Sequence, residues 1–167
     1  MVNGTNRVIF EQLYPDVVEP QRATAGSAGY DVRAYLQGRS IEVLAGSQSK
    51  QLFDCKDRLI LRPGERAAIP LGFRASLPEG LEAQIRLRSS IAFKRGLVMP
   101  NSPATVDSDY PGEWLILVAN GINEPVAIHH LERIAQIVFT RFETVQWQSG
   151  LVIATSNRTG GLGSTGT

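Results

Sequence analysis

Residues 66–88, RAAIPLGFRASLPEGLEAQIRLR, decide the fold class that the sequence predicts. They contain two short runs rich in apolar side chains, 66–77 and 81–88, with the tripeptide Pro-Glu-Gly between them. Proline fixes φ and glycine accepts positive φ, so this tripeptide predicts a tight turn. Short apolar runs joined by such a turn are typical of neighbouring β-strands.

The same pattern continues on both sides of this stretch. The motifs RPGE, YPGE and NGINEP mark further turns, because each combines proline or glycine with polar residues. Six more runs are therefore predicted to be strands: 8–13, 30–36, 58–62, 114–120, 125–131 and 133–143. Strands at this spacing indicate an all-β fold, either a barrel or a jelly roll.

Three segments fall outside the strand pattern. SSIAFKR at 89–95 is predicted to be a short helix with Ser89 as its N-cap. The segment 37–57 is polar and has no regular apolar pattern, so a long surface loop is expected there. From Thr155 the chain has too few apolar side chains to pack by itself. We therefore expect one domain over 1–154 and a flexible glycine-rich tail over 155–167.

Length and charge exclude several classes of protein. A chain of 167 residues with 43% apolar and 20% charged residues suits one globular domain. Its net charge of +1 provides no overall field for nucleic acid or an anionic membrane, so neither is an expected partner. The N-terminal residues show no apolar h-region and no apolar run approaches 18 residues, so neither secretion nor a membrane span is expected. The single cysteine, Cys55, excludes an internal disulfide and fits a reducing compartment such as the cytoplasm.

The segment 101–113, NSPATVDSDYPGE, carries the residues best suited to chemistry. Asp107 and Asp109 are two residues apart, so an extended chain would place them side by side on one face. Two close carboxylates are costly unless one is protonated, hydrogen-bonded or opposite a cation. The basic segment 88–95, RSSIAFKR, lies just upstream and offers cations. Carboxylates near a basic, hydroxyl-rich segment suggest chemistry on a phosphate ester.

Two of these features allow more than one interpretation. The start of the helix at 89–95 could bind an anion together with Arg88, or it could be an ordinary capped surface helix. The tail sequence GGLGSTG lacks the lysine of a Walker loop, so it is either a disordered end or a flap that closes on a bound anion with Arg158. The adjacent histidines at 129–130 would face opposite ways on a strand, which favours ordinary strand residues over a metal site.

Five segments of the chain resemble, in order, the five motifs of the trimeric dUTP diphosphatase (dUTPase) family. They are AGSAGYDVRA (25–34), RSSIAFKRG (88–96), NSPATVDSDYPGE (101–113), ERIAQIVF (132–139) and RTGGLGSTG (158–166). The resemblance implies a distorted jelly-roll β-barrel of the dUTPase-like β-clip type. It also implies a homotrimer with sites shared between subunits, and hydrolysis of dUTP to dUMP and diphosphate by attack of water on the α-phosphorus.

The resemblance also assigns roles to individual residues. Asp107 would be the general base that activates the water, and Asp109 a structural residue, ion-paired within the barrel. Tyr110 would lie against the deoxyribose and exclude a 2′-hydroxyl. Magnesium would be held mainly by the triphosphate, with Asp31 acting only through water. The remaining substrate contacts would be Arg88, Ser89, Ser90 and Gln136 for the phosphates, Asn101, Thr105 and Val106 for uracil, and Arg158, Leu162 and Ser164 from the tail.

Two departures from the family pattern lie in the tail. Leu162 stands where an aromatic side chain usually stacks on the base, a contact of about 1–3 kcal/mol. The spacing between Arg158 and the following glycine pair is one residue shorter than usual.

Two other functions stay open at the level of sequence. A dCTP deaminase has a related barrel, but Leu117 and Phe93 occupy the positions of its catalytic glutamate and its second-motif arginine. A non-catalytic relative could bind a nucleotide or a protein as a regulatory module, and the altered tail is the main support for that hypothesis.

Overall fold

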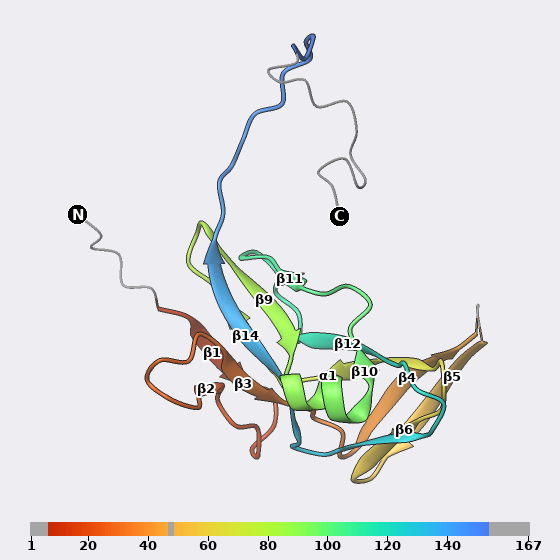
Figure 1. Ribbon diagram of the computed structural model, residues 1–167. Coiled ribbons are helices and arrows are strands. Elements are labelled where there is room, and N and C mark those ends of the chain that lie inside the picture. The colour runs from red at the N-terminus through yellow and green to blue at the C-terminus, as the bar shows by residue number, and fades with distance from the viewer. Residues whose placement is uncertain (1–6, 47–48, 154–167) are drawn as a thin grey trace.

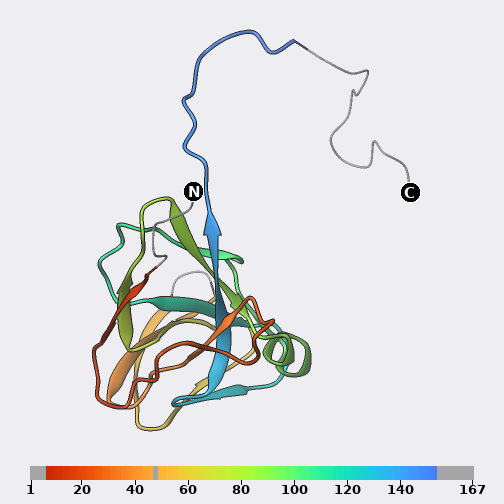
Figure 2. The ribbon, with the colours of Figure 1, turned by 90° about the vertical axis from the view of Figure 1, so that its left-hand side faces the viewer.

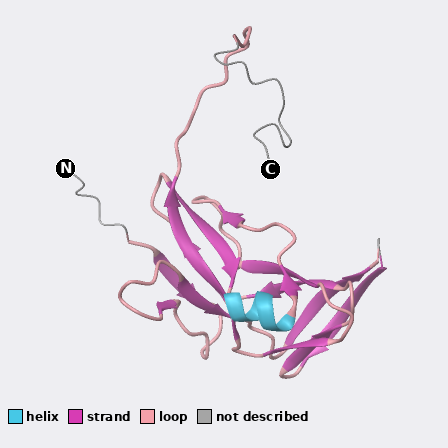
Figure 3. Cartoon of the chain, in the orientation of Figure 1, coloured by secondary structure: helices cyan, strands magenta, loops and turns pink. Residues whose placement is uncertain are grey.

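The computed structural model describes residues 7–46 and 49–153. These residues form strands and one short helix, α1 (Ser89–Arg95), as Figure 3 shows. The strands divide among four sheets instead of one continuous barrel. The predicted all-β, jelly-roll-like fold with a short helix is confirmed, and Figure 1 shows how the strands and the helix are arranged.

The first five-stranded sheet carries most of the segments that resemble family motifs. Its order is β11-β9-β14-β3-β2, and every neighbouring pair is antiparallel. The long strands β9 and β14 form its centre, and β11 lies on one edge. The bounds are β2 Gln21–Arg22, β3 Tyr30–Arg33, β9 Leu81–Leu87, β11 Ala104–Val106 and β14 Arg133–Arg141.

The second five-stranded sheet has the order β10-β12-β7-β4-β5. Two smaller sheets pair β1 with β8 and β13 with β6. The bounds in the second sheet are β4 Arg39–Ala45, β5 Ser49–Cys55, β7 Arg66–Pro70, β10 Leu97–Val98 and β12 Leu115–Asn120. Those of the smaller sheets are β1 Ile9–Gln12, β6 Arg58–Leu61, β8 Phe73–Ser76 and β13 Val126–His129.

The core lies between the inner faces of these sheets. Alternate residues of β12 and β9 are buried, as expected for strands with one face on a core. The largest fully buried side chains include Trp114, Leu36, Leu59, Ile69, Ile85, Ile116, Ile128 and Ile137. In the part of the chain that the structure describes, no helix is long and apolar enough to cross a bilayer.

The prediction of a long surface loop over 37–57 is wrong. This segment forms an antiparallel hairpin of β4 and β5 in continuous register from Arg39↔Cys55 to Ala45↔Ser49. Ile41 and Val43 are buried on β4, whereas most of β5 is exposed on both faces at the sheet edge. β5 is largely exposed and rich in polar residues, so the segment 37–57 as a whole shows no regular apolar pattern, although β4 buries Ile41 and Val43.

Two local boundaries also differ from the prediction. The run 66–77 is not one strand, because Leu71-Gly72 separates β7 from β8 and Gly72 has φ +76°. A Cβ at Gly72 would lie 2.6 Å from Val17 and 2.8 Å from the Tyr35 ring, so glycine is required there. The N-cap of α1 is Arg88, which makes no side-chain capping bond, and not Ser89. The turn predicted at Pro-Glu-Gly is confirmed, with Gly80 at φ +78°.

After β14 the chain leaves the body of the protein. Residues 142–153 have no regular structure and extend away from the sheets, as Figure 2 shows. Their side chains are exposed, and Trp147 is 95% exposed.

Candidate functional site

The junction of β9 and α1 gathers the first group of candidate residues. Arg88 lies between β9 and α1. Its backbone N–H donates a hydrogen bond to Ile134 O at 3.1 Å, and this bond joins the junction to β14. Ser89 and Ser90 follow with exposed side chains. Their hydroxyls are therefore available to a ligand at this end of the sheet.

Asp31 holds two arginines together beside this junction. Its Oδ1 lies 3.3 Å from Arg88 Nε, and its Oδ2 lies 3.2 Å from Arg133 Nη1. The Asp31 side chain is only 15% exposed. The metal contact through water that is expected for Asp31 stays a prediction. The two ion pairs were not predicted, and they restrict the position of the Arg88 side chain.

Gln136 lies next to this cluster in the sheet register. It is opposite Asp31 on β3 and opposite Arg86 on β9. Gly29 leaves the space that the Gln136 side chain fills, because a Cβ there would lie 2.8 Å from Gln136 Cδ. The segments that resemble the first, second and fourth motifs are thus brought together by β3, β9 and β14.

A cavity of about 410 Å3 beside α1 is strongly basic. Its cations come from the helix segment and from the start of β14, and Glu132 is the one acid in its lining. Glu132 forms an ion pair with Arg95 and accepts a hydrogen bond from His129 N at 3.0 Å, so it fastens α1 to the β13–β14 turn. The lining residues are Arg88, Ser90, Ile91, Lys94, Arg95, Glu132 and Arg133. Sequence reasoning missed Arg133, although its place in the fourth motif was a usable signal.

The segment 101–113 lies on a different part of the sheet. β11 pairs with β9 through Ala104↔Ile85, Thr105↔Gln84 and Val106↔Ala83. Thr105 and Asn101 are exposed, while Val106 is buried. Because β11 is an edge strand, its outer backbone groups have no strand partner among the described residues.

The two aspartates do not sit side by side on an extended strand as predicted. The chain turns directly after β11, where Tyr110 N donates to Asp107 O at 3.2 Å. Both carboxylates are exposed. The expected ion pair of Asp109 within the barrel is not seen among the described residues, so it stays a prediction. The local turn overrides the period-two geometry of a strand.

Sequence reasoning gave no role to Glu113, which closes this segment. Its carboxylate forms a bidentate ion pair with Arg39 on β4, and its backbone carbonyl accepts a hydrogen bond from Tyr110 Oη at 3.3 Å. The signal available in the sequence was only its place at the end of the motif.

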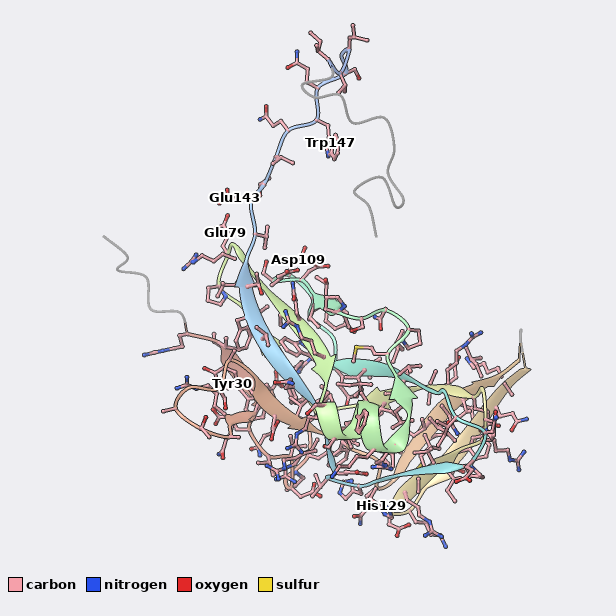
Figure 4. All side chains as sticks on the ribbon, in the orientation of Figure 1. Tyr30, Glu79, Asp109, His129, Glu143 and Trp147 are labelled. Carbon is pink, nitrogen blue, oxygen red and sulfur yellow. The ribbon has the colours of Figure 1, made fainter. Side chains whose placement is uncertain are left out.

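Asp107 and Arg88 lie at opposite ends of β9. Since Val106 is opposite Ala83, Asp107 lies at the level of Glu82, six residues before Arg88. At about 3.3 Å per residue this is a separation of about 20 Å. In Figure 4 the labelled Asp109 lies toward the end of β9 that is away from α1. One chain therefore does not bring the third-motif carboxylates to the basic cluster.

Other predicted site residues lie elsewhere. Arg158, Leu162 and Ser164, with the whole predicted tail, lie outside the described residues. His129 is exposed, whereas His130 Nδ1 accepts hydrogen bonds from Leu36 N and Gln37 N, so the two face different surroundings. Within 7–46 and 49–153, no three His, Cys, Asp or Glu side chains form a group that could hold a metal ion.

The sequence matches known proteins along most of its length. The profile of the dUTPase family matches residues 52–166. A deoxyuridine 5′-triphosphate nucleotidohydrolase of Rhizobium rhizogenes is 40% identical over 148 residues, which cover 88% of this chain and 84% of the relative. The protein of the same name from Rhizobium meliloti is 40% identical over 149 residues, which cover 89% and 82%.

Solved structures agree in fold. A dUTPase from Streptococcus mutans has a TM-score of 0.64 at 26% identity, covering 83% of this chain and 99% of that one. The dUTPase of Staphylococcus bacteriophage 80alpha with dUPNHPP has a TM-score of 0.75 at 22% identity, covering 98% and 100%. With the family profile over more than half of the chain and relatives at 40% identity, this chain belongs to the dUTPase family and is a hydrolase.

Proposed function

We propose that Asp107 is the general base with which this hydrolase converts dUTP to dUMP and diphosphate. It would draw a proton from a water that attacks the α-phosphorus, so that the α–β phosphoanhydride bond breaks and diphosphate leaves. The observation that carries this proposal is the free carboxylate. Asp107 is exposed directly after β11, and no described residue forms an ion pair or hydrogen bond with its side chain. It can therefore accept a proton from a bound water.

We assign the phosphate chain to the cluster around α1. Arg88 would make charge-assisted hydrogen bonds, the Ser89 and Ser90 hydroxyls would donate to phosphate oxygens, and Gln136 would contribute its amide. The positive charge of the neighbouring cavity supports this assignment, because it favours an anion with several charges. The Asp31 ion pairs also support it, since they limit the freedom of the Arg88 guanidinium before substrate arrives.

We assign uracil and deoxyribose to the segment 101–113. The free outer edge of β11 supports this, because the backbone groups at Thr105 and Val106 can pair with a base as a neighbouring strand would. Asn101 would complete the recognition of the uracil edge. Tyr110 would cover the sugar and leave no room for a 2′-hydroxyl, which selects deoxynucleotides.

We further propose that three copies assemble and that each site combines residues of different subunits. The separation of about 20 Å between Asp107 and Arg88 supports shared sites, because both ends must contact one nucleotide. The exposed segment 142–153 also supports assembly, since an apolar surface such as Trp147 is expected to be covered. A cavity of about 530 Å3, lined mainly by apolar residues of β1, β3, β8 and β14, could receive such a segment.

Members of this family are metal-dependent, and we propose Mg2+ as the metal. Since the described part of the chain has no carboxylate cage, the ion would enter on the triphosphate, and Asp31 would contact it only through water. A hard cation there would neutralise phosphate charge when bound. The tail residues Arg158, Leu162 and Ser164 are proposed to close over the bound nucleotide.

The test of the base uses a matched pair of variants. Asp107→Asn is expected to abolish dUMP formation, whereas Asp109→Asn, two residues away and equally exposed, should retain most activity. Diphosphate release is measured with a coupled pyrophosphatase in the presence of Mg2+, and dCTP, dTTP and UTP serve as control substrates. If Asp107→Asn hydrolyses dUTP at the wild-type rate, the proposal is wrong. A uracil nucleotide formed from dCTP would instead indicate a deaminase.

Shared sites have a test of their own. Asp107→Asn and Arg88→Ala chains are each expected to be inactive, but co-expression should restore activity, because some mixed sites receive neither substitution. A mixture that stays inactive, or a light-scattering mass near the 18.2 kDa of one chain, would contradict the proposal.

A further inference from the structure

The segment 107–113 carries both the proposed base and the proposed sugar contact, and it is fastened to the protein at its two ends. At its upstream end, β11 pairs with β9. At its downstream end, Trp114 N donates to Phe73 O at 3.0 Å and Leu71 N donates to Trp114 O at 3.0 Å. Between these ends Asp107 and Tyr110 are exposed. Their positions therefore depend on how rigidly the two ends are held.

Glu113 makes the side-chain connection at the downstream end. Arg39 Nη1 donates to Glu113 Oε1 at 2.9 Å, and Arg39 Nη2 donates to Oε2 at 2.7 Å. Gly72 N also donates to Oε1, at 2.9 Å. The two side chains are 22% and 18% exposed, so the pair is largely shielded from water. A bidentate pair with a third hydrogen bond fixes both the distance and the orientation of Glu113.

Arg39 is in turn held in place by aromatic rings. Its guanidinium lies over the Tyr14 ring, 5.1 Å from the ring centroid. Tyr14 stacks on the buried Tyr35, with centroids 4.4 Å apart and an angle of 14° between the planes. This stacking gives the arginine a fixed position on β4. Arg39 lies outside all five segments that resemble the family motifs.

The connection continues from Glu113 to the proposed sugar contact. Tyr110 Oη donates to the Glu113 carbonyl at 3.3 Å. The loop is tight here, since a Cβ on Gly112 would lie 2.7 Å from Tyr110 Cζ. A shift of Glu113 would thus be passed to the Tyr110 ring.

We propose that Arg39 and Glu113 are positioning residues for the nucleotide-binding segment 107–113, and that they determine how strictly the enzyme prefers a deoxyribose. This inference rests on the proposed roles of Asp107 and Tyr110. Loss of the bidentate geometry lets Glu113 and the Tyr110 ring move. A ribose then fits better and a deoxyribose is held less accurately, because misplacement by about 1 Å can cost about 100-fold in rate.

The test compares kcat and KM for dUTP and UTP in conservative variants. Arg39→Lys keeps the positive charge but cannot form the bidentate pair. Glu113→Gln keeps the shape of the side chain but loses its negative charge. Each is expected to lower kcat for dUTP about 10- to 100-fold and to lower the ratio of kcat/KM for dUTP over UTP at least several-fold. The double variant should be little worse than either single one, because both break the same pair. The control is Glu42→Gln, on the same strand as Arg39, which breaks the exposed ion pair between Glu42 and Lys50 of β5.

The selectivity ratio separates positioning from folding. Both substrates meet the same fraction of folded enzyme, so partial unfolding lowers both activities equally and leaves the ratio unchanged. A wild-type ratio in Arg39→Lys and Glu113→Gln, or an equal change in Glu42→Gln, would overturn the inference. A wild-type enzyme that forms no dUMP would instead overturn the proposed function. An active wild type with unaffected variants overturns only the inference.

Discussion

Substitution of Gly29 by alanine tests the packing that holds Gln136 at the proposed phosphate site. Gly29 is buried directly before β3, in the first of the five motif-like segments. A Cβ there would lie 2.8 Å from Gln136 Cδ and 3.0 Å from its Cβ, and it would overlap Oε1. The end of the glutamine side chain can rotate away, but its Cβ cannot. Gly29→Ala therefore displaces the amide from the sheet position that it now occupies.

The magnitude follows from these contacts. Adding one methyl group to a closely packed site costs about 1–3 kcal/mol of stability. If Gln136 rotates away, one hydrogen bond to a charged phosphate is lost, which contributes about 1.5–3 kcal/mol. This corresponds to a fall in kcat/KM for dUTP of about 10- to 100-fold. We expect the variant to lose kcat/KM while most of the protein stays folded at the assay temperature.

The assay measures diphosphate release from dUTP, with thermal unfolding followed in parallel. Gly26→Ala is the matched control, because a Cβ at Gly26 would meet nothing within 4 Å. In the Gln136→Ala background, Gly29→Ala should add little further loss, since the amide is already absent. Wild-type kcat/KM in Gly29→Ala, or an equal loss in Gly26→Ala, would refute the reasoning.

Two further predictions concern titratable groups. Burial raises the pKa of the Cys55 thiol, so Ellman's reagent should react with native protein much more slowly than with protein in urea. Reaction at the unfolded rate would show that Cys55 is accessible. Hydrogen bonds from Tyr35 and then His130 lower the pKa of Asp16, so its contribution to stability is present above about pH 4 and is lost as the pH falls through the lowered pKa. Asp16→Asn should reduce the loss of stability on acidification in urea titrations, and an unchanged pH dependence would contradict this.

Much of the fold could be predicted from the sequence because its signals are local. The Pro-Glu-Gly turn and the strand predicted over 81–88 depend only on neighbouring residues, and both appear in the structure, the strand over Leu81–Leu87. The hairpin at 39–55 was missed for a physical reason. β5 forms the edge of its sheet and is exposed on both faces for most of its length, so its sequence need not alternate.

Part of the candidate site could likewise be predicted from local sequence, and part could not. The order of the five segments is visible in the sequence, and so is the placement of hydroxyls after Arg88. The ion pairs that hold these segments are not visible. Glu113 and Arg39 are 74 residues apart, and Asp31 reaches Arg133 over 102 residues. No local pattern indicates such a pair, because it depends on the register of strands that are distant in the chain.

A protein with a net charge of only +1 can bind a nucleoside triphosphate if its positive charges are gathered at one place, and the ion pairs gather them. At one end of β9, several cations face a single cavity, and carboxylates hold three of them in place. At the other end, Asp107 is exposed and forms no ion pair with a described residue, so its carboxylate is free to contact a water molecule. The proposed base is thus separated from the basic cavity by about the length of one strand. A nucleotide that contacts both ends would have to bridge two chains, as the proposed shared sites require.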